Sequence, residues 1–288
     1  MQTSARIRVL IYCRGANAEL FRTLVSLSRQ TIGSKRLNIA LASSAPSEHA
    51  TREARLLHSS LGFGSVEVLD TTAQNPARAL NIAALNTSAG EGEQWLLLVP
   101  TGTRLSPRFT AACLAAVDAR VQAVFSAHTA GTMDGAPFIR VRPFSVEQLT
   151  RCNPVGPATL VRREAWETLG GLRPELRLAM WDFWLRLALS GGGIARVPEL
   201  LAHCRPLSRQ PAWRDGQAKA LLVVATPGAF EPDVCRWALA LLRGDVWAHP
   251  FDNGHIPTPQ EVRTMAADAL ARAYATRPEW EPEGLRTA

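Results

Sequence analysis

The first 130 residues alternate between segments typical of buried strands and segments with helical spacing, and this alternation constrains the fold more than any other feature. Strand-like apolar runs occupy residues 6–13, 37–43, 66–70, 95–99 and 121–127. The segments between them suit helices: residues 19–31, with Leu20, Leu24 and Leu27 at helical spacing, and residues 77–86 and 107–119. Strands and helices by turns predict a mostly parallel sheet with helices on both faces.

Ligands of such sheets bind beyond the carboxyl ends of the strands, where the connecting loops diverge. The loops to inspect are therefore residues 12–15, 43–47, 71–76 and 100–104. A further helix is expected between the second and third strands, beginning near Pro46 and placing Leu56 and Leu57 on its inner face.

The pattern changes after residue 130. Shorter strands are expected at residues 137–144 and 157–163, helices at 164–171 and 180–193, and a last strand at 194–205. Residues 206–216 have the composition of a linker, and helices follow near residues 233–242 and from Pro259, where Thr258 and Glu261 have the spacing of a capping box. We therefore expect an α/β domain at residues 1–205 and a linker with a helical appendage at residues 206–288. The last helix carries an apolar face that suggests docking onto the main body: Val262, Met265, Ala269 and Ala273.

Composition excludes several classes of protein. The longest apolar runs, residues 95–99 and 239–242, fall far short of the roughly 20 residues that cross a bilayer, so no transmembrane helix is expected. The start of the chain shows no apolar segment long enough for a signal peptide, which predicts a cytoplasmic location. The net charge of +7 rests on arginine, but no basic run with interleaved aromatic residues predicts nucleic-acid binding. The five cysteines lie far apart and show no metal-binding spacing.

Four blocks of the sequence resemble the family 2 glycosyltransferases of the GT-A fold. The blocks are VLIYCRGANAELFRTLVSLSRQT, NPARALNIAALNTSAGEGEQWLLLVPTGTRLSP, LVRREAWETLGGL and WDFWLRLALSGGGIARVPELLAHCR, and they span roughly residues 6–205. The resemblance implies a nucleotide-diphospho-sugar bound over the strand ends and a divalent metal between its two phosphates. It also implies inverting sugar transfer to an acceptor hydroxyl, with an aspartate as general base.

The metal motif of that family is missing from this chain. The Asp-x-Asp positions fall on Pro100, Thr101 and Gly102, which supply no carboxylate. A cation between two phosphates needs ionised oxygen ligands, so we expect no metal ligands and no divalent metal here. Thr101 and Thr103 can at most hydrogen-bond a phosphate or a sugar hydroxyl.

Other positions that the resemblance places around the nucleotide also depart from the family pattern. Ser43 and Ser44 stand where a pair of aspartates is usual, and the first loop contains Tyr12 and Arg14. Asn81 matches the family, and it either braces the neighbouring loop or contacts the ligand.

The general base is the third departure. The family's acidic residue falls on Met180, whose thioether cannot accept a proton. Asp182 is the acidic candidate nearby, but a two-residue offset on a helix turns it by about 200°. It also lies four residues before Arg186, the spacing of an ion pair, so Asp182 is either a structural partner or a catalytic group. Arg173 stands where the family usually has an aspartate.

Two functions remain open. The first is a protein without sugar-transfer chemistry, a pseudoenzyme that acts as a partner subunit or sugar- or nucleotide-binding module in a glycan or glycoconjugate pathway. The second is a metal-independent inverting transferase in which Arg14, Arg104 and Arg173 neutralise the diphosphate, with Asp182 or Glu175 as base. The sequence is compatible with an enzyme and with a non-catalytic protein.

Two further features have a structural and a functional interpretation. The tryptophans are either a sugar-stacking or protein-binding surface or, for Trp181 and Trp184, part of a buried core. The segment HPFDNGH brings His249, Asp252 and His255 close together, as a weak metal site or as a surface turn.

Overall fold

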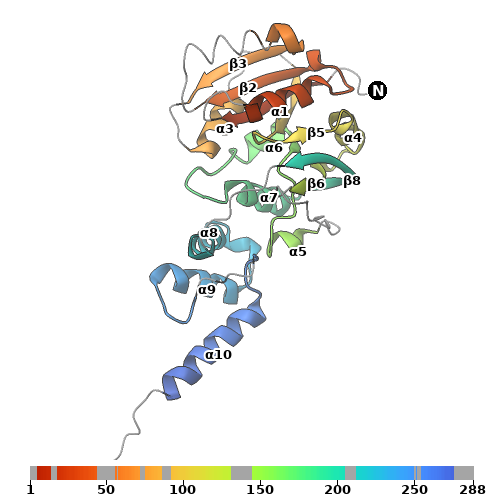
Figure 1. The fold of residues 1–288 in the computed structure, drawn as a ribbon. Coiled ribbons are helices and arrows are strands. Elements are labelled where there is room, and N and C mark those ends of the chain that lie inside the picture. Colours follow the sequence, from red (N-terminus) through yellow and green to blue (C-terminus); the bar gives the residue numbers. More distant parts are fainter. Residues whose placement is uncertain are drawn as a thin grey trace, which may run out of the picture. The chain divides into compact units, whose positions relative to one another are not determined.

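The computed structural model describes residues 5–13, 18–43, 56, 58–71, 75–85, 92–130, 145–204, 212–249, 251 and 254–275 (Figure 1). The chain divides into two compact units. The first contains residues 1–149 and 153–209, and the second contains residues 150–152 and 210–288.

The first unit is built on an eight-stranded sheet in the order β3-β2-β1-β4-β7-β6-β8-β5. The strands are β1 (Arg6–Cys13), β2 (Leu37–Ser43), β3 (Ser65–Asp70), β4 (Glu93–Leu98), β5 (Arg104–Leu105), β6 (Val121–Ala130), β7 (Thr159–Arg162) and β8 (Gly193–Cys204). Only β7 and β5 run antiparallel to their neighbours. The parallel strands therefore end at one common edge, which we call the carboxyl edge. The mostly parallel sheet that the sequence predicts is confirmed.

Helices cover both faces of this sheet. They are α1 (Ala18–Ser28), α3 (Pro76–Leu85), α4 (Phe109–Ala115), α5 (Val146–Leu149), α6 (Arg163–Thr168) and α7 (Ala179–Leu189), with a short 3-10 turn at Ser34–Arg36. Alternate residues of β1 point to opposite faces. Val9 belongs to the core with Leu24 of α1, whereas the guanidinium of Arg8 reaches the backbone of α3 at Ala83.

The second unit is helical, with α8 (Ala212–Ala225), a 3-10 turn (Pro227–Ala229), α9 (Pro232–Arg243) and α10 (Pro259–Ala275). Trp237 of α9 is fully buried. The predicted capping box of α10 is confirmed, because the Glu261 carboxylate accepts from the Thr258 backbone N–H at 2.7 Å and the Glu261 N–H donates to the Thr258 hydroxyl at 3.2 Å. No helix in the described part of the chain is long and apolar enough to cross a membrane.

Three sequence predictions about these elements were wrong. The predicted linker at residues 206–216 is helical from Ala212, because α8 packs against α9. Leu56 is 58% exposed, so it does not lie on an inner face. The helix expected over residues 107–119 is shorter, since a turn follows Ala115 and Asp118 accepts hydrogen bonds from the start of the next strand. In α10 only Val262 is buried and Ala273 is exposed; the docking of this helix onto the main body stays a prediction.

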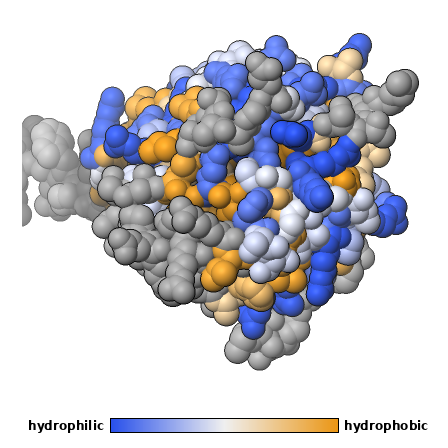
Figure 2. Space-filling view, turned by 90° about the horizontal axis from the view of Figure 1, so that it is seen from above, coloured by the Kyte–Doolittle hydropathy of each residue, from blue (hydrophilic) through white to orange (hydrophobic). Residues whose placement is uncertain are grey.

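Several predicted features lie outside the described residues: the strand at 137–144, Pro46, Leu57, and the site candidates Arg14 and Ser44. On the face of the molecule in Figure 2, hydrophilic residues are interspersed with hydrophobic ones and do not form one continuous block.

Candidate functional site

The turn between β4 and β5 lies at the carboxyl edge, where the resemblance places the metal motif. The Thr101 hydroxyl donates to the Tyr12 carbonyl oxygen at 2.7 Å, and the Gly102 N–H donates to the Thr23 hydroxyl at 3.0 Å. Gly102 has φ = +89°, a backbone angle that glycine adopts readily. Thr103 is buried and hydrogen-bonded to the Cys204 thiol, whose pKa burial raises to about 11 despite that bond. The polar groups of the turn are therefore engaged with the protein itself.

These groups do not fit a divalent cation. Mg²⁺ and Mn²⁺ favour carboxylate oxygens, and the turn offers one hydroxyl that donates to a backbone carbonyl and another that is buried. No group of three or more metal-ligating side chains occurs among the residues that the structure describes.

The ends of β1 and β2 lie beside this turn. Tyr12 is half-buried and Ser43 is 1% exposed. Both the backbone N–H and the hydroxyl of Thr71 donate to the Ser43 carbonyl oxygen at 3.1 Å, which joins the ends of β2 and β3. Burial at this level leaves Ser43 little side-chain surface for a ligand.

A row of polar side chains crosses β6, β8 and β5 at the same edge. Arg104 of β5 is the register partner of His203 in β8, which is in turn the register partner of Thr129 in β6. The Thr129 hydroxyl and His203 Nδ1 are 2.9 Å apart. Arg104 and His203 are both exposed. Arg104 was a sequence candidate, whereas His203 and Thr129 were not predicted, because cross-strand register between distant residues leaves no local pattern.

His128, the neighbour of Thr129, has a different environment. Burial lowers the pKa of His128 and the charge of Arg196 adds to this effect, while a hydrogen bond with the Ser126 backbone opposes it. His128 is therefore neutral at neutral pH and adds no positive charge to the edge.

Asn81 holds the loop between α6 and α7 against α3. Its amide donates to the Leu172 carbonyl oxygen at 2.7 Å and accepts from the Leu172 N–H at 2.8 Å. Arg186 binds the same loop from α7, donating to the carbonyl oxygens of Leu169 and Gly171, each at 2.7 Å. Both polar groups of the Asn81 amide are thus used in bracing, one of the two roles that the sequence left open.

Asp182 is fully buried between two guanidinium groups. Arg186 Nε lies 2.8 Å from its Oδ2, and Arg173 Nη1 lies 3.2 Å from its Oδ1. A carboxylate held in this way lacks the open approach that an acceptor hydroxyl needs. The geometry is that of the structural ion pair, and it also commits Arg173, one of the arginines considered for the diphosphate.

The tryptophans of the first unit form a buried core. Trp166, Trp181 and Trp184 are 2%, 6% and 1% exposed, and Phe183 packs against both Trp166 and Trp184. They are therefore not available as a sugar-stacking surface. In the second unit, His255 pairs with Glu261 at 3.3 Å, while Asp252 lies outside the described residues.

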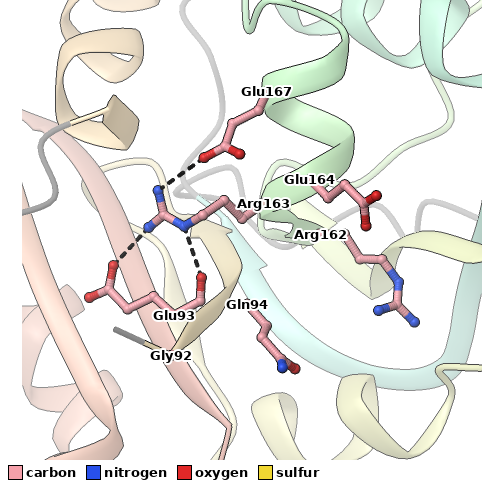
Figure 3. Close-up of a pocket in the computed structure, with 7 residues that line it drawn as sticks. All are labelled: Gly92, Glu93, Gln94, Arg162, Arg163, Glu164 and Glu167. Carbon is pink, nitrogen blue, oxygen red and sulfur yellow. Dashed lines mark hydrogen bonds and ion pairs between the residues drawn. The ribbon is translucent and has the colours of Figure 1, made fainter. Parts of the chain in front are cut away.

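A surface pocket of about 380 Å³ opens at the opposite edge of the sheet, at the start of β4 (Figure 3). Its central side chain, Arg163, donates to the Glu93 carboxylate at 2.7 Å, to the Glu93 carbonyl oxygen at 2.8 Å and to the Ala84 carbonyl oxygen at 2.7 Å. Arg162 donates to the Val121 carbonyl oxygen and lies over the Trp95 ring. These contacts join strands and helices, so we assign the pocket a structural role.

Comparison with known proteins gives matches only at the level of structure. No protein-family model and no curated protein sequence matches the chain. A solved structure of the mannosyltransferase PcManGT from Pyrobaculum calidifontis, in complex with GDP-Man and Mn²⁺, matches with a TM-score of 0.62 and 17% identity. That match covers 95% of this chain and 76% of PcManGT.

Solved structures of TarS from S. aureus match similarly. The 1–349 fragment in complex with UDP-GlcNAc gives a TM-score of 0.61 with 12% identity, over 86% of this chain and 74% of the fragment. A longer TarS structure matches over 83% of this chain and 43% of its own length. The chain has a GT-A glycosyltransferase-like fold. At these identities the likeness shows the fold alone, and the predicted GT-A architecture is confirmed.

Proposed function

We propose that this GT-A-like chain binds a nucleotide sugar at the carboxyl edge without a divalent metal and does not transfer the sugar. It would serve as a partner or binding subunit in a glycan or glycoconjugate pathway. The observation that carries the proposal is the β4–β5 turn. Pro100 and Gly102 stand at the carboxylate positions of the metal motif, and Thr101 and Gly102 hydrogen-bond to the protein itself. A nucleotide sugar is the ligand class because the similar solved structures hold GDP-Man and UDP-GlcNAc.

The burial of Asp182 supports the non-catalytic part of this proposal. Direct displacement at the sugar carbon needs a base that can reach the acceptor hydroxyl. Asp182 is 0% exposed and its two oxygens face Arg173 and Arg186. Freeing it would break two ion pairs of a buried carboxylate, which is costly.

Calorimetric titration tests the binding. The full chain is titrated with UDP, GDP and TDP, first with EDTA and then with Mn²⁺. We expect one nucleotide to bind with the same affinity in both conditions, and the corresponding nucleotide sugar to remain intact on prolonged incubation by chromatography. Binding that requires Mn²⁺ would contradict the proposal, and so would breakdown of the sugar donor.

A metal-independent inverting transferase is the second candidate, and the exposure of Glu175 favours it. Glu175 follows Pro174, whose carbonyl oxygen accepts from Asn75, the residue that precedes α3 near the carboxyl edge. The loop thus presents an exposed carboxylate on a braced backbone. Glu175→Gln would then abolish release of nucleotide diphosphate in the presence of acceptors. Glu164→Gln, at another exposed carboxylate, which lines the pocket of Figure 3, would leave it unchanged.

A further inference from the structure

We propose that Arg104, His203 and Thr129 form an anion site that binds the phosphate groups of the ligand and supplies most of its affinity. We call these three residues the edge row. The inference rests on the proposed nucleotide-sugar binding. It states that the protein recognises this ligand mainly through its diphosphate. The three strands that carry the row, β6, β8 and β5, lie side by side in the sheet (Figure 1).

Register places the side chains of the row on one face. Residues directly opposite in an antiparallel pair have Cβ atoms about 4.5–5.5 Å apart on the same face. Leu105 and Ala202, the neighbouring pair, point to the opposite face and join the core. Arg104 and His203 therefore lie together outside that core, at the end of the sheet where ligands of this kind of fold bind.

The contact with Thr129 orients the imidazole of His203. When the Thr129 hydroxyl donates to Nδ1, at the observed 2.9 Å, the proton of neutral His203 lies on Nε2. The Nε2–H group is then a donor that points away from Thr129, and the hydrogen bond at Nδ1 fixes the orientation of the ring. A phosphate oxygen is an acceptor that matches this donor.

Arg104 supplies the charge. No residue in the described part of the chain forms a hydrogen bond or ion pair with Arg104, whereas Arg173 is bound to Asp182 and Arg163 to Glu93. A guanidinium group binds two phosphate oxygens at once and keeps its charge at all working pH values. The Arg104 guanidinium and the His203 N–H donor lie on directly opposite residues of β5 and β8. An anion between them can accept hydrogen bonds from both.

The experiment uses inorganic pyrophosphate and UDP as probes of the full chain, titrated calorimetrically in EDTA. We expect pyrophosphate to bind and to compete with UDP, and uridine to do neither. Arg104→Ala and His203→Ala should each weaken both probes by about tenfold or more, because each removes a charge-assisted or oriented donor. His203→Gln, which keeps a donor, should weaken them less.

Arg120→Ala is the matched control, since Arg120 is exposed and lies just before β6, at the opposite edge. It should leave both affinities unchanged. Circular dichroism of each variant confirms the fold. If UDP binds but neither pyrophosphate competition nor the edge-row substitutions affect it, the anion site is wrong and the proposed function stands. If none of UDP, GDP and TDP binds the wild-type chain, both fail together.

Discussion

At the scale of single residues, Gly171 shows how the loop beside α7 depends on one missing side chain. Gly171 has φ = +69°, and a Cβ atom there would lie 2.5 Å from Asn81 Oδ1 and 3.0 Å from Trp166 Nε1. Gly170 has a similar φ of +71° but nothing within 4 Å of its Cβ position. A substitution at Gly170 therefore introduces backbone strain alone, whereas one at Gly171 introduces both backbone strain and a steric clash.

We predict that Gly171→Ala lowers the free energy of unfolding by about 2–4 kcal/mol, of which about 1–2 kcal/mol is the backbone term. Gly170→Ala should cost only that backbone term. Urea denaturation of both variants measures the difference. Equal losses of unfolding free energy at the two positions would show that Asn81 does not occupy the space next to the Cβ position of Gly171.

Asp182 allows a prediction that separates its two roles. Asp182→Asn leaves Arg186, whose side chain is 11% exposed, without its carboxylate, and removal of one partner from a buried pair costs about 3–5 kcal/mol. Arg173→Met should cost about 1 kcal/mol or less, since that side chain is 36% exposed. Chemical denaturation checks both. An Asp182→Asn variant of wild-type stability that had lost a sugar-transfer activity would instead identify a catalytic base.

At the scale of elements, the capping box of α10 predicts a dependence on pH. Burial acts to raise the pKa of Glu261, but hydrogen bonds from the Thr258 N–H, the Thr258 hydroxyl and His255 outweigh it, so the pKa lies below its ordinary value. Because the pKa of Glu261 is lower in the folded form than its unfolded value near 4.5, the ionised carboxylate stabilises the folded form above that pH. This contribution is lost as the pH falls through the folded-state pKa.

We therefore expect the thermal stability of the second unit to fall below about pH 4.5, in part through Glu261. Thr258→Ala removes one of the hydrogen bonds to the carboxylate and should flatten this part of the pH profile. It should also cost about 0.5–2 kcal/mol at neutral pH as a lost N-cap. Thr264→Ala, which is exposed on the same helix, is the control. Identical pH profiles for Thr258→Ala and wild type would exclude the capping contribution.

The elements differ in how far sequence alone predicts them. The strands β1, β2 and β4 carry continuous apolar runs, and the start of α10 carries a capping box, so local pattern determines both. α8 was missed because Gly216 and polar residues occupy its first turns, and packing against α9 overrides their weak propensity. At the candidate site, the β4–β5 turn and Arg104 could be predicted because they directly follow an apolar strand in the sequence. The pairing of Asp182 with Arg173 and of His203 with Thr129 depends on tertiary geometry that has no local signal.

At the scale of the whole molecule, the two compact units each contain a buried tryptophan. Trp166 lies in the first unit and Trp237 in the second, at 2% and 0% exposure. Units with separate cores can unfold in separate cooperative steps. We predict two transitions in calorimetric unfolding of the full chain.

Trp237→Ala should lower one transition only, because deletion of a buried tryptophan costs about 3–5 kcal/mol within the core that contains it. Trp166→Ala should lower the other. Pyrophosphate at saturating concentration should raise the transition that Trp166→Ala lowers, since the edge row belongs to the first unit and a ligand stabilises the unit that binds it. A single transition that moves as a whole in both variants would show that the units unfold as one. Pyrophosphate that raised only the Trp237-sensitive transition would place the anion site outside the edge row.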